Sequence, residues 1–294
     1  MIRPGIYPAS VTPFDPKGKP DPVSTAKLLA WFEAAGCSGA VLAGTNGEGP
    51  SLSPVEKRDL IRDAMPLRGK LDLILGIATS SSDEAVWLCK QAAALEATAV
   101  LLMAPYYFRE ASEDAIRQWF EVVLDRSPTP VLVYNFPQRT GVTLTAETMA
   151  QLAKHETMAG AKDSSGSESN IADYKQAIGE KSLFVGNETL LLKALEAGWS
   201  GSISGAANVL ATWLCQIYKE WTGGDKESAE TKFQIILPLL QAIRSCPQPA
   251  TNKALLARIG VIADGTPRLP LVSADPVAAE DLSRQIQQAI GLKF

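Results

Sequence analysis

The sequence has a single histidine, and its 294 residues contain neither G-x-G-x-x-G nor G-x-x-x-x-G-K-[ST]. With only His155 available, histidine-rich zinc sites and the H-E-x-x-H motif are excluded, and a Ser-His-Asp triad would depend on this one residue. The two missing glycine motifs are the usual signatures of dinucleotide and nucleotide binding. Any chemistry must therefore come from lysine, tyrosine, threonine, arginine or carboxylate side chains.

Long apolar runs and blocks of like charge are also absent. No stretch approaches the ~18 apolar residues of a membrane span, and residues 1–10 lack the apolar centre of a secretory signal. The 28 basic and 32 acidic residues give a net charge of −4, which argues against a nucleic-acid partner. The four cysteines lack C-x-x-C spacing and are typical of reduced thiols. We expect a cytoplasmic protein that binds neither membranes nor nucleic acid.

Eight short apolar segments alternate with helical patterns along the first two thirds of the chain. They recur about every 28 residues, which is the length of a strand with its crossover helix. The segments are apolar nearly throughout, as are parallel strands buried on both faces. Eight such units predict an α/β fold, a (β/α)8 TIM barrel, and a doubly wound open sheet is the alternative. The expected strands span residues 6–11, 39–43, 71–77, 99–103, 131–134, 158–162, 183–186 and 200–204.

Capping residues mark the expected starts of several helices. Asp21 and Ser53 each precede a proline at the first helical position. Ser-x-x-Glu patterns, which are typical of a capping box, begin at Ser53, Ser81 and Ser165.

The last part of the chain shows helical patterns without strand patterns. We therefore divide the chain into a barrel over residues 1–224 and a C-terminal helical extension over residues 225–294. The helices of this extension are expected at residues 226–244, 250–259 and 275–290.

Polar residues follow most of the expected strands, at the end of the barrel where TIM-barrel sites lie. The turn Gly44-Thr45-Asn46-Gly47-Glu48-Gly49 follows the second strand. Backbone N–H groups of such a turn can converge on an anion, here a carboxylate, and Thr45 adds a hydroxyl that can pass a proton. The alternative is that these glycines serve turn geometry alone.

Lys162 ends the sixth expected strand among small and apolar residues. If Lys162 points inward, the period of two turns its neighbour Asp163 outward, away from an ion pair. Burial disfavours a charged amine and lowers its pKa, so that the neutral amine can attack a ketone and form a Schiff base. The alternative is an exposed lysine at a strand end.

Three further side chains extend the candidate site. Tyr134 ends the fifth strand and is expected near Lys162 across the barrel mouth, where a phenol can relay a proton. Arg139 lies in the following loop, where a guanidinium can bind a carboxylate. Tyr107, beside Phe108, suits an aromatic patch at a subunit contact. A structural barrel aromatic and a surface arginine are the alternatives for Tyr134 and Arg139.

Together these motifs resemble the dihydrodipicolinate synthase/N-acetylneuraminate lyase family of pyruvate-dependent class I aldolases. The similarity begins at Tyr7-Pro-Ala-Ser-Val-Thr-Pro-Phe14 and continues to Ser204-Gly-Ala-Ala-Asn-Val209, and the helical tail also fits. The resemblance implies that Lys162 forms the Schiff base with pyruvate and that Tyr134 is the proton shuttle beside it.

The resemblance also implies roles for residues of other loops and of a neighbouring subunit. Thr45 would link Tyr134 to Tyr107, which would reach in from that subunit, and the usual assembly is a homotetramer made of two dimers. Thr45 and Asn46 would hold the pyruvate carboxylate. The carboxylate of the second substrate would bind Arg139.

The resemblance further implies that the Gly186 carbonyl and Ile203 flank the bound pyruvate. No metal or other cofactor is implied beyond the covalent imine on Lys162. The expected ligands are a small keto acid and an aldehyde.

Two positions depart from the synthase pattern. Asn46 stands where synthases usually have threonine, and Lys162 is followed by Asp-Ser-Ser-Gly. Both departures resemble relatives that cleave 4-hydroxy-2-oxoglutarate or 2-keto-3-deoxy sugar acids. Arg139 instead favours the synthase, which condenses pyruvate with aspartate semialdehyde in lysine biosynthesis.

The expected activity is that of a Schiff-base-forming lyase of the dihydrodipicolinate synthase type, with the aldolases as the alternative. Two alternatives belong to other functional classes. One is a phosphate-binding barrel enzyme that uses no Schiff base, and the other is a non-catalytic barrel that binds pyruvate.

Overall fold

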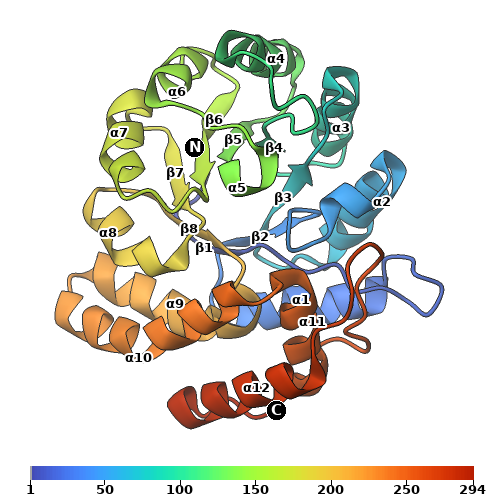
Figure 1. The fold of residues 1–294 in the computed structure, drawn as a ribbon, viewed down its shortest axis with the longest axis vertical. Coiled ribbons are helices and arrows are strands. Elements are labelled where there is room, and N and C mark those ends of the chain that lie inside the picture. Colours follow the sequence, from blue (N-terminus) through green and yellow to red (C-terminus); the bar gives the residue numbers. More distant parts are fainter. Residues whose placement is uncertain (1) are drawn as a thin grey trace.

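The computed structural model describes residues 2–294, and its eight parallel strands form one barrel (Figure 1). The sheet order is β1-β8-β7-β6-β5-β4-β3-β2, and a parallel bridge between Ala9 and Val41 joins the end of β1 to β2. This closure confirms the predicted TIM barrel and excludes the open sheet. The strands are β1 (Gly5–Pro8), β2 (Gly39–Leu42), β3 (Asp72–Ile77), β4 (Ala99–Met103), β5 (Val131–Asn135), β6 (Met158–Asp163), β7 (Ser182–Val185) and β8 (Gly201–Ser204).

A ring of helices surrounds the strands (Figure 1). The main ones are α1 (Pro22–Ala34), α2 (Pro54–Ala64), α3 (Ser82–Ala94), α4 (Glu113–Arg126), α6 (Ala146–Leu152), α7 (Ser169–Ile178), α8 (Leu191–Glu196) and α9 (Ala207–Gly223). Four short helical segments lie in the loops, namely η1 (Gly49–Ser51), η2 (Met65–Leu67), α5 (Pro137–Thr140) and η3 (Glu188–Leu190).

The side chains pack in two layers, one inside the barrel and one between the barrel and its helices. The strands are almost wholly buried because each has one face in each layer. The larger layer includes Leu28, Phe32 and Phe120 from the helices. The barrel interior is filled by Tyr7, Ala9, Val41, Ile74, Ala78, Ala99, Leu101, Met103, Leu132, Tyr134, Phe184 and Ile203.

Three of the four predicted helix caps are confirmed. Asp21 accepts a hydrogen bond from the Val23 N–H, Ser53 forms a full capping box with Glu56, and the Ser81 side chain accepts from the Glu84 N–H. The prediction for Ser165 is wrong, because α7 begins four residues later without a side-chain cap. The Ser165 hydroxyl instead donates to the buried Asp163 carboxylate at 2.7 Å, a charge-assisted bond.

The predicted C-terminal extension is helical, with α10 (Lys226–Ser245), α11 (Gln248–Ile259) and α12 (Pro276–Ile290). Helix α10 packs on α9, and α11 contacts α9, α10 and α12. These contacts continue from the last barrel helix into the extension, so the division at residues 224 and 225 stays a prediction. None of the helices described within residues 2–294 has the length and apolar character needed to span a membrane.

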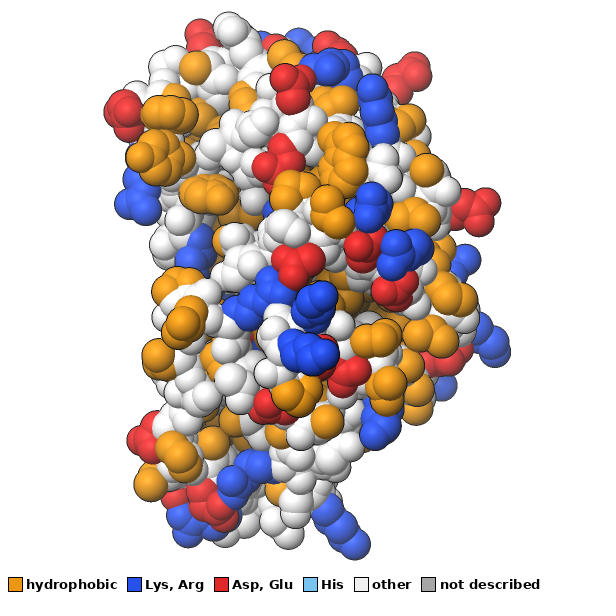
Figure 2. Space-filling model, turned by 90° about the vertical axis from the view of Figure 1, so that its right-hand side faces the viewer, with side chains coloured by type: hydrophobic (Ala, Val, Ile, Leu, Met, Phe, Trp, Pro, Cys, Tyr) orange, Lys and Arg blue, Asp and Glu red, His pale blue; other side chains and the backbone are white. Residues whose placement is uncertain are grey.

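Acidic and basic side chains are interspersed on the surface. Figure 2 shows the side of the molecule that lies to the right in Figure 1, where Lys and Arg side chains have Asp and Glu beside them. On α2, Arg62 lies 2.7 Å from Asp59 and 2.9 Å from Asp63. Pairs as exposed as these contribute little to stability.

Arg268 joins the C-terminal loop to the start of α2. Its guanidinium contacts both carboxylate oxygens of Glu56, at 2.5 Å and 3.0 Å, and donates from Nη1 to the Ser51 carbonyl at 3.1 Å. The hydrogen bond from Arg268 is the largest cause of a lowered pKa for Glu56, from 4.5 to about 2. Ionised Glu56 therefore stabilises the folded chain.

We expect Glu56→Gln to lower the free energy of unfolding at pH 7 by about 1–2 kcal/mol, since the pair is partly screened by solvent. The folded pKa lies below the unfolded one, so this contribution is complete above pH 4.5 and is lost as the pH falls toward 2. Urea unfolding of the parent and of Glu56→Gln at pH 7 and pH 3 measures this contribution to the free energy of unfolding. A stability difference that stayed constant between these pH values would contradict the role given to Glu56.

Candidate active site

Lys162 lies near the end of β6, with Tyr134 of β5 and Phe184 of β7 as its register partners. The residue is 5% exposed, and its Nζ lies 4.3 Å from the centre of the Tyr134 ring. Among residues 2–294, no carboxylate lies within ion-pair distance of this amine. Asp163 points elsewhere, as predicted, and accepts a hydrogen bond from Asn135 Nδ2 at 2.7 Å.

Tyr134 lies beside Lys162 on the adjacent strand and not across the barrel mouth, which corrects the expected placement. Its buried hydroxyl accepts a hydrogen bond from Ser164 Oγ at 3.2 Å. The sequence reasoning missed Ser164 as a site residue. The period of two could have found it, because Ser164 follows Lys162 by two residues and so shares its side of the backbone.

The turn after β2 has the tight geometry that its glycines predict. Glu48 adopts a left-handed backbone with φ of 55°, and a Cβ on Gly49 would lie 1.9 Å from the Ala43 carbonyl oxygen. The hydroxyl of Thr45 is buried and has no hydrogen-bond partner among the described residues. The Asn46 side chain is held by Asn252 Nδ2, which donates to its Oδ1 at 2.9 Å.

A buried ion pair lies behind this turn. Glu48 pairs with Lys253 of α11, both side chains are 0% exposed, and the Arg268 N–H donates to Glu48 at 2.7 Å. Burial lowers the pKa of Lys253, and the hydrogen bond and charge of Glu48 oppose this shift. The amine also donates to the Thr266 carbonyl at 3.1 Å. The pair therefore connects the extension to the turn that carries Thr45, a link the sequence reasoning missed.

Gly186, at the end of β7, provides the space that Lys162 occupies. A Cβ at this position would lie 2.9 Å from Lys162 Cε and 2.0 Å from Ser164 Oγ. Any larger residue would displace the Ser164 side chain and crowd the lysine.

Most of the predicted site residues line one small cavity of about 120 Å³. Its wall includes Lys162, Tyr134 and the turn after β2, and Arg139 reaches it from α5. The sequence reasoning missed the side chains that the C-terminal extension adds, because no local pattern indicates where α10 and α11 pack. The lining residues are Ala9, Thr45, Asn46, Tyr134, Phe136, Arg139, Lys162, Ser164, Gly186, Gly205, Arg244, Cys246, Gln248 and Pro249.

Two predicted residues lie outside this wall. Ile203 is fully buried inside the barrel, where it is the register partner of Tyr7. Tyr107 is 75% exposed and packs its ring against Phe108, with centroids 5.1 Å apart. The expected link between Thr45 and Tyr134 is absent in the single chain, since the Thr45 hydroxyl has no partner there.

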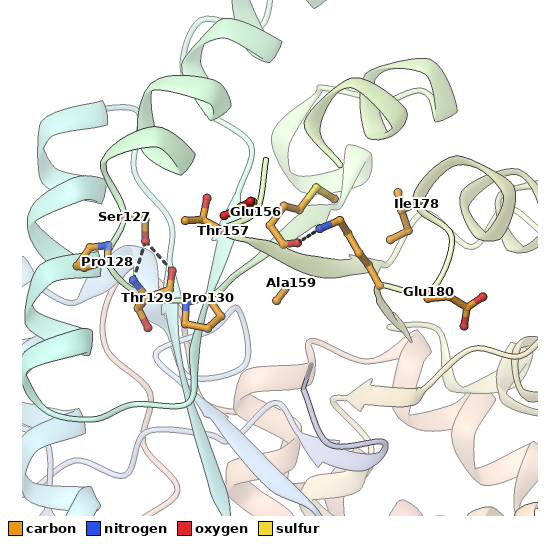
Figure 3. Close-up of a pocket in the computed structure, with 11 residues that line it drawn as sticks. Ser127, Pro128, Thr129, Pro130, Glu156, Thr157, Ala159, Ile178 and Glu180 are labelled. Carbon is orange, nitrogen blue, oxygen red and sulfur yellow. Dashed lines mark hydrogen bonds between the residues drawn. The ribbon is translucent and has the colours of Figure 1, made fainter. Parts of the chain in front are cut away.

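A larger cavity of about 700 Å³ lies at the opposite end of the barrel (Figure 3). It is formed where β5, β6 and β7 begin, and the Lys181 amine there donates to the Met158 carbonyl at 2.7 Å. TIM-barrel chemistry takes place at the other end of the strands, so this cavity is not the candidate site. Within residues 2–294, no group of three or more His, Cys, Asp or Glu residues could hold a metal ion.

Comparisons with known proteins agree with this geometry. The dihydrodipicolinate synthetase family matches residues 3–289. A 4-hydroxy-tetrahydrodipicolinate synthase from Listeria innocua is 35% identical over 274 residues, covering 91% of this chain and 92% of the relative. The solved dihydrodipicolinate synthase from Thermotoga maritima has a TM-score of 0.93 at 29% identity, covering 99% of this chain and 100% of that one.

A further solved structure was determined in complex with pyruvate. This prophage protein of the dihydrodipicolinic acid synthase family from E. coli K12 has a TM-score of 0.93 at 26% identity, covering 99% of this chain and 100% of that one. Since the family match spans nearly the whole sequence and the barrel superposes along its full length, the chain belongs to the dihydrodipicolinate synthetase family.

Proposed function

We propose that this chain is a pyruvate-dependent, Schiff-base-forming lyase of the dihydrodipicolinate synthase type, acting in lysine biosynthesis. Its relatives are named 4-hydroxy-tetrahydrodipicolinate synthase. The observation that carries the proposal is the Lys162 amine, which is enclosed at the end of β6 beside the Tyr134 phenol and has no carboxylate partner among the described residues.

In the proposed mechanism the Lys162 amine attacks the keto carbon of pyruvate, and the resulting carbinolamine loses water. The protonated imine then withdraws electrons, so that a methyl proton passes to water and an enamine forms. The enamine carbon adds to the aldehyde carbon, and Tyr134 protonates the new alkoxide. Water then hydrolyses the product imine, which frees the Lys162 amine. The reverse order of steps cleaves the product.

In this mechanism the turn after β2 binds the carboxylate of pyruvate. The Thr45 hydroxyl, which has no hydrogen-bond partner among residues 2–294, and the fixed Asn46 side chain both line the cavity and supply hydrogen-bond donors there. The Gly186 carbonyl lies beside Lys162 at the same wall. The reaction uses no metal or organic cofactor, because the imine itself stabilises the carbanion.

Reduction with borohydride in the presence of pyruvate tests this proposal. A mass gain confined to the peptide that contains Lys162 is expected, since borohydride fixes an imine as a stable amine. Absence of any adduct would refute the Schiff base and favour a phosphate-binding barrel. An adduct without turnover on any aldehyde would favour a non-catalytic pyruvate-binding barrel.

For the second substrate we propose aspartate semialdehyde, whose carboxylate would bind Arg139 at the cavity wall. Cleavage of 4-hydroxy-2-oxoglutarate or a 2-keto-3-deoxy sugar acid is the second candidate. It is supported by Asn46 and Ser164, which line the cavity and depart from the synthase pattern. Rates with pyruvate plus aspartate semialdehyde, measured beside rates of cleavage of 4-hydroxy-2-oxoglutarate and 2-keto-3-deoxygluconate, separate the two.

The arginine itself can be tested by substitution. We expect Arg139→Ala to form the pyruvate imine but to lose condensation with an acidic aldehyde by about 10- to 100-fold, because a charge-assisted hydrogen bond is removed. Imine trapping and kcat/KM for the aldehyde measure the two effects separately. Turnover at the parent rate would show that Arg139 does not bind the carboxylate.

We further propose a cytoplasmic homotetramer made of two dimers, in which Tyr107 completes the site of a neighbouring subunit. Tyr107 and Phe108 are exposed large aromatic side chains on one loop, as at a subunit contact. The four cysteines are free, as is typical of a reducing compartment. Sedimentation of the parent and of Tyr107→Ser tests the contact.

A further inference from the structure

Arg244 brings a second guanidinium to the cavity from the C-terminal extension. It lies in the last turn of α10, and its Nη1 is 3.5 Å from the Gly186 carbonyl oxygen, beside the end of β7. Its side chain is 32% exposed and lines the same cavity as Lys162 and Arg139. The guanidinium is therefore accessible to a molecule bound at the Lys162 amine.

Glu188 holds this guanidinium in place. The Glu188 side chain is 0% exposed, and its Oε1 accepts hydrogen bonds from Ser204 Oγ at 2.7 Å and from the Ala206 N–H at 3.0 Å. Its Oε2 accepts from Arg244 Nη1 at 3.2 Å. Because a buried carboxylate needs a partner, this contact fixes the direction of the Arg244 side chain. Glu188 itself is too deeply buried to touch a substrate.

The charge that faces the cavity is positive. Its lining contains the guanidinium groups of Arg139 and Arg244 and, among residues 2–294, no acidic residue. Arg139 is exposed, whereas Arg244 is held by Glu188. The hydrogen bonds between Arg244 and the other described residues all come from its Nη1. Its Nη2 and Nε donors are therefore left for a ligand.

We propose that Arg244, positioned by Glu188, is a specificity-determining residue that binds the carboxylate of the second substrate. This inference rests on the proposed function, in which the turn after β2 binds the carboxylate of pyruvate. The two guanidinium groups are then left for the aldehyde. The enzyme would accept aldehydes that carry a carboxylate and, in the cleavage direction, keto acids with a carboxylate at each end.

Succinic semialdehyde and butanal test this selectivity, because both have four carbons and only the first carries a carboxylate. The kcat/KM of each aldehyde with pyruvate is measured for the parent, Arg244→Gln, Arg244→Lys and Glu188→Gln. Arg258→Gln is the matched control, since Arg258 pairs with Glu280 outside the cavity and the substitution changes charge by the same amount. Borohydride trapping of pyruvate is recorded for every variant.

We expect Arg244→Gln to lower kcat/KM for succinic semialdehyde by about 10- to 100-fold relative to butanal. Arg244→Lys should restore part of this ratio, because it keeps the charge without the planar fork. Glu188→Gln should shift the ratio in the same direction by a smaller factor, and Arg258→Gln should leave it unchanged.

Equal losses for both aldehydes in Arg244→Gln and Arg244→Lys would overturn the inference, because a merely structural role lowers both rates together. An unchanged ratio in a variant that still traps pyruvate would overturn it as well. Failure of the parent to trap pyruvate on Lys162 would instead remove the proposed function, so the two failures are distinguishable.

Discussion

Replacement of Lys162 by alanine is expected to abolish the pyruvate imine and to lower turnover by about 10³-fold or more. The amine supplies the bond that activates pyruvate, and no second lysine lines the cavity within the described part of the chain. Mass spectrometry after borohydride reduction, together with the rate of condensation, measures both effects. Lys162→Arg is a second informative variant, because its guanidinium keeps a long side chain with hydrogen-bond donors but cannot form the imine.

Lys181→Ala is the control for this experiment. Lys181 precedes β7 at the opposite end of the barrel, and its amine donates to the Met158 carbonyl at 2.7 Å. This variant should still form the pyruvate adduct on Lys162. If Lys162→Ala retained the adduct on another lysine and turned over at the parent rate, the assignment of the nucleophile would be wrong.

Lys253→Met is expected to give the largest loss of stability, about 3–5 kcal/mol in the free energy of unfolding. The substitution leaves the Glu48 carboxylate buried without the charge that compensates it. A buried unpaired carboxylate must either remain ionised at high cost or take up a proton. Urea unfolding followed by circular dichroism at pH 7 measures the change.

Two further variants show whether the loss of stability in Lys253→Met comes from the unpaired charge of Glu48. Adding Glu48→Gln to Lys253→Met should recover part of the stability, since the buried charge is then gone. Lys193→Met breaks the exposed pair with Glu168 and should cost less than ~1 kcal/mol. Equal effects of Lys253→Met and Lys193→Met would rule out the special role of burial.

The barrel was predictable because its signals are local. Each expected strand coincides with an observed one to within a few residues, since apolar runs are required wherever a strand is buried on both faces. Placing Lys162, Tyr134 and the turn at Thr45 at one end needed only the rule that parallel strands end together. The orientation of Lys162 away from Asp163 followed from the period of two.

The remaining parts of the site depend on packing between distant segments. Arg244 and Gln248 reach the cavity because α10 and α11 fold back over the barrel, and no nearby motif indicates this. The buried partner of Glu48 lies 205 residues later in the sequence, at Lys253. The wrong cap at Ser165 has a local origin, because its hydroxyl donates to the buried Asp163 carboxylate two residues earlier in the chain.

The position of α10 and α11 has a consequence for synthesis on the ribosome. All eight strands are complete once Ser204 has been made, yet Arg244 and Gln248 of the cavity wall and the Lys253 partner of Glu48 follow later. A nascent barrel can therefore close before it has a finished pocket. The wall around its reactive lysine is complete only after Pro249 has emerged from the exit tunnel.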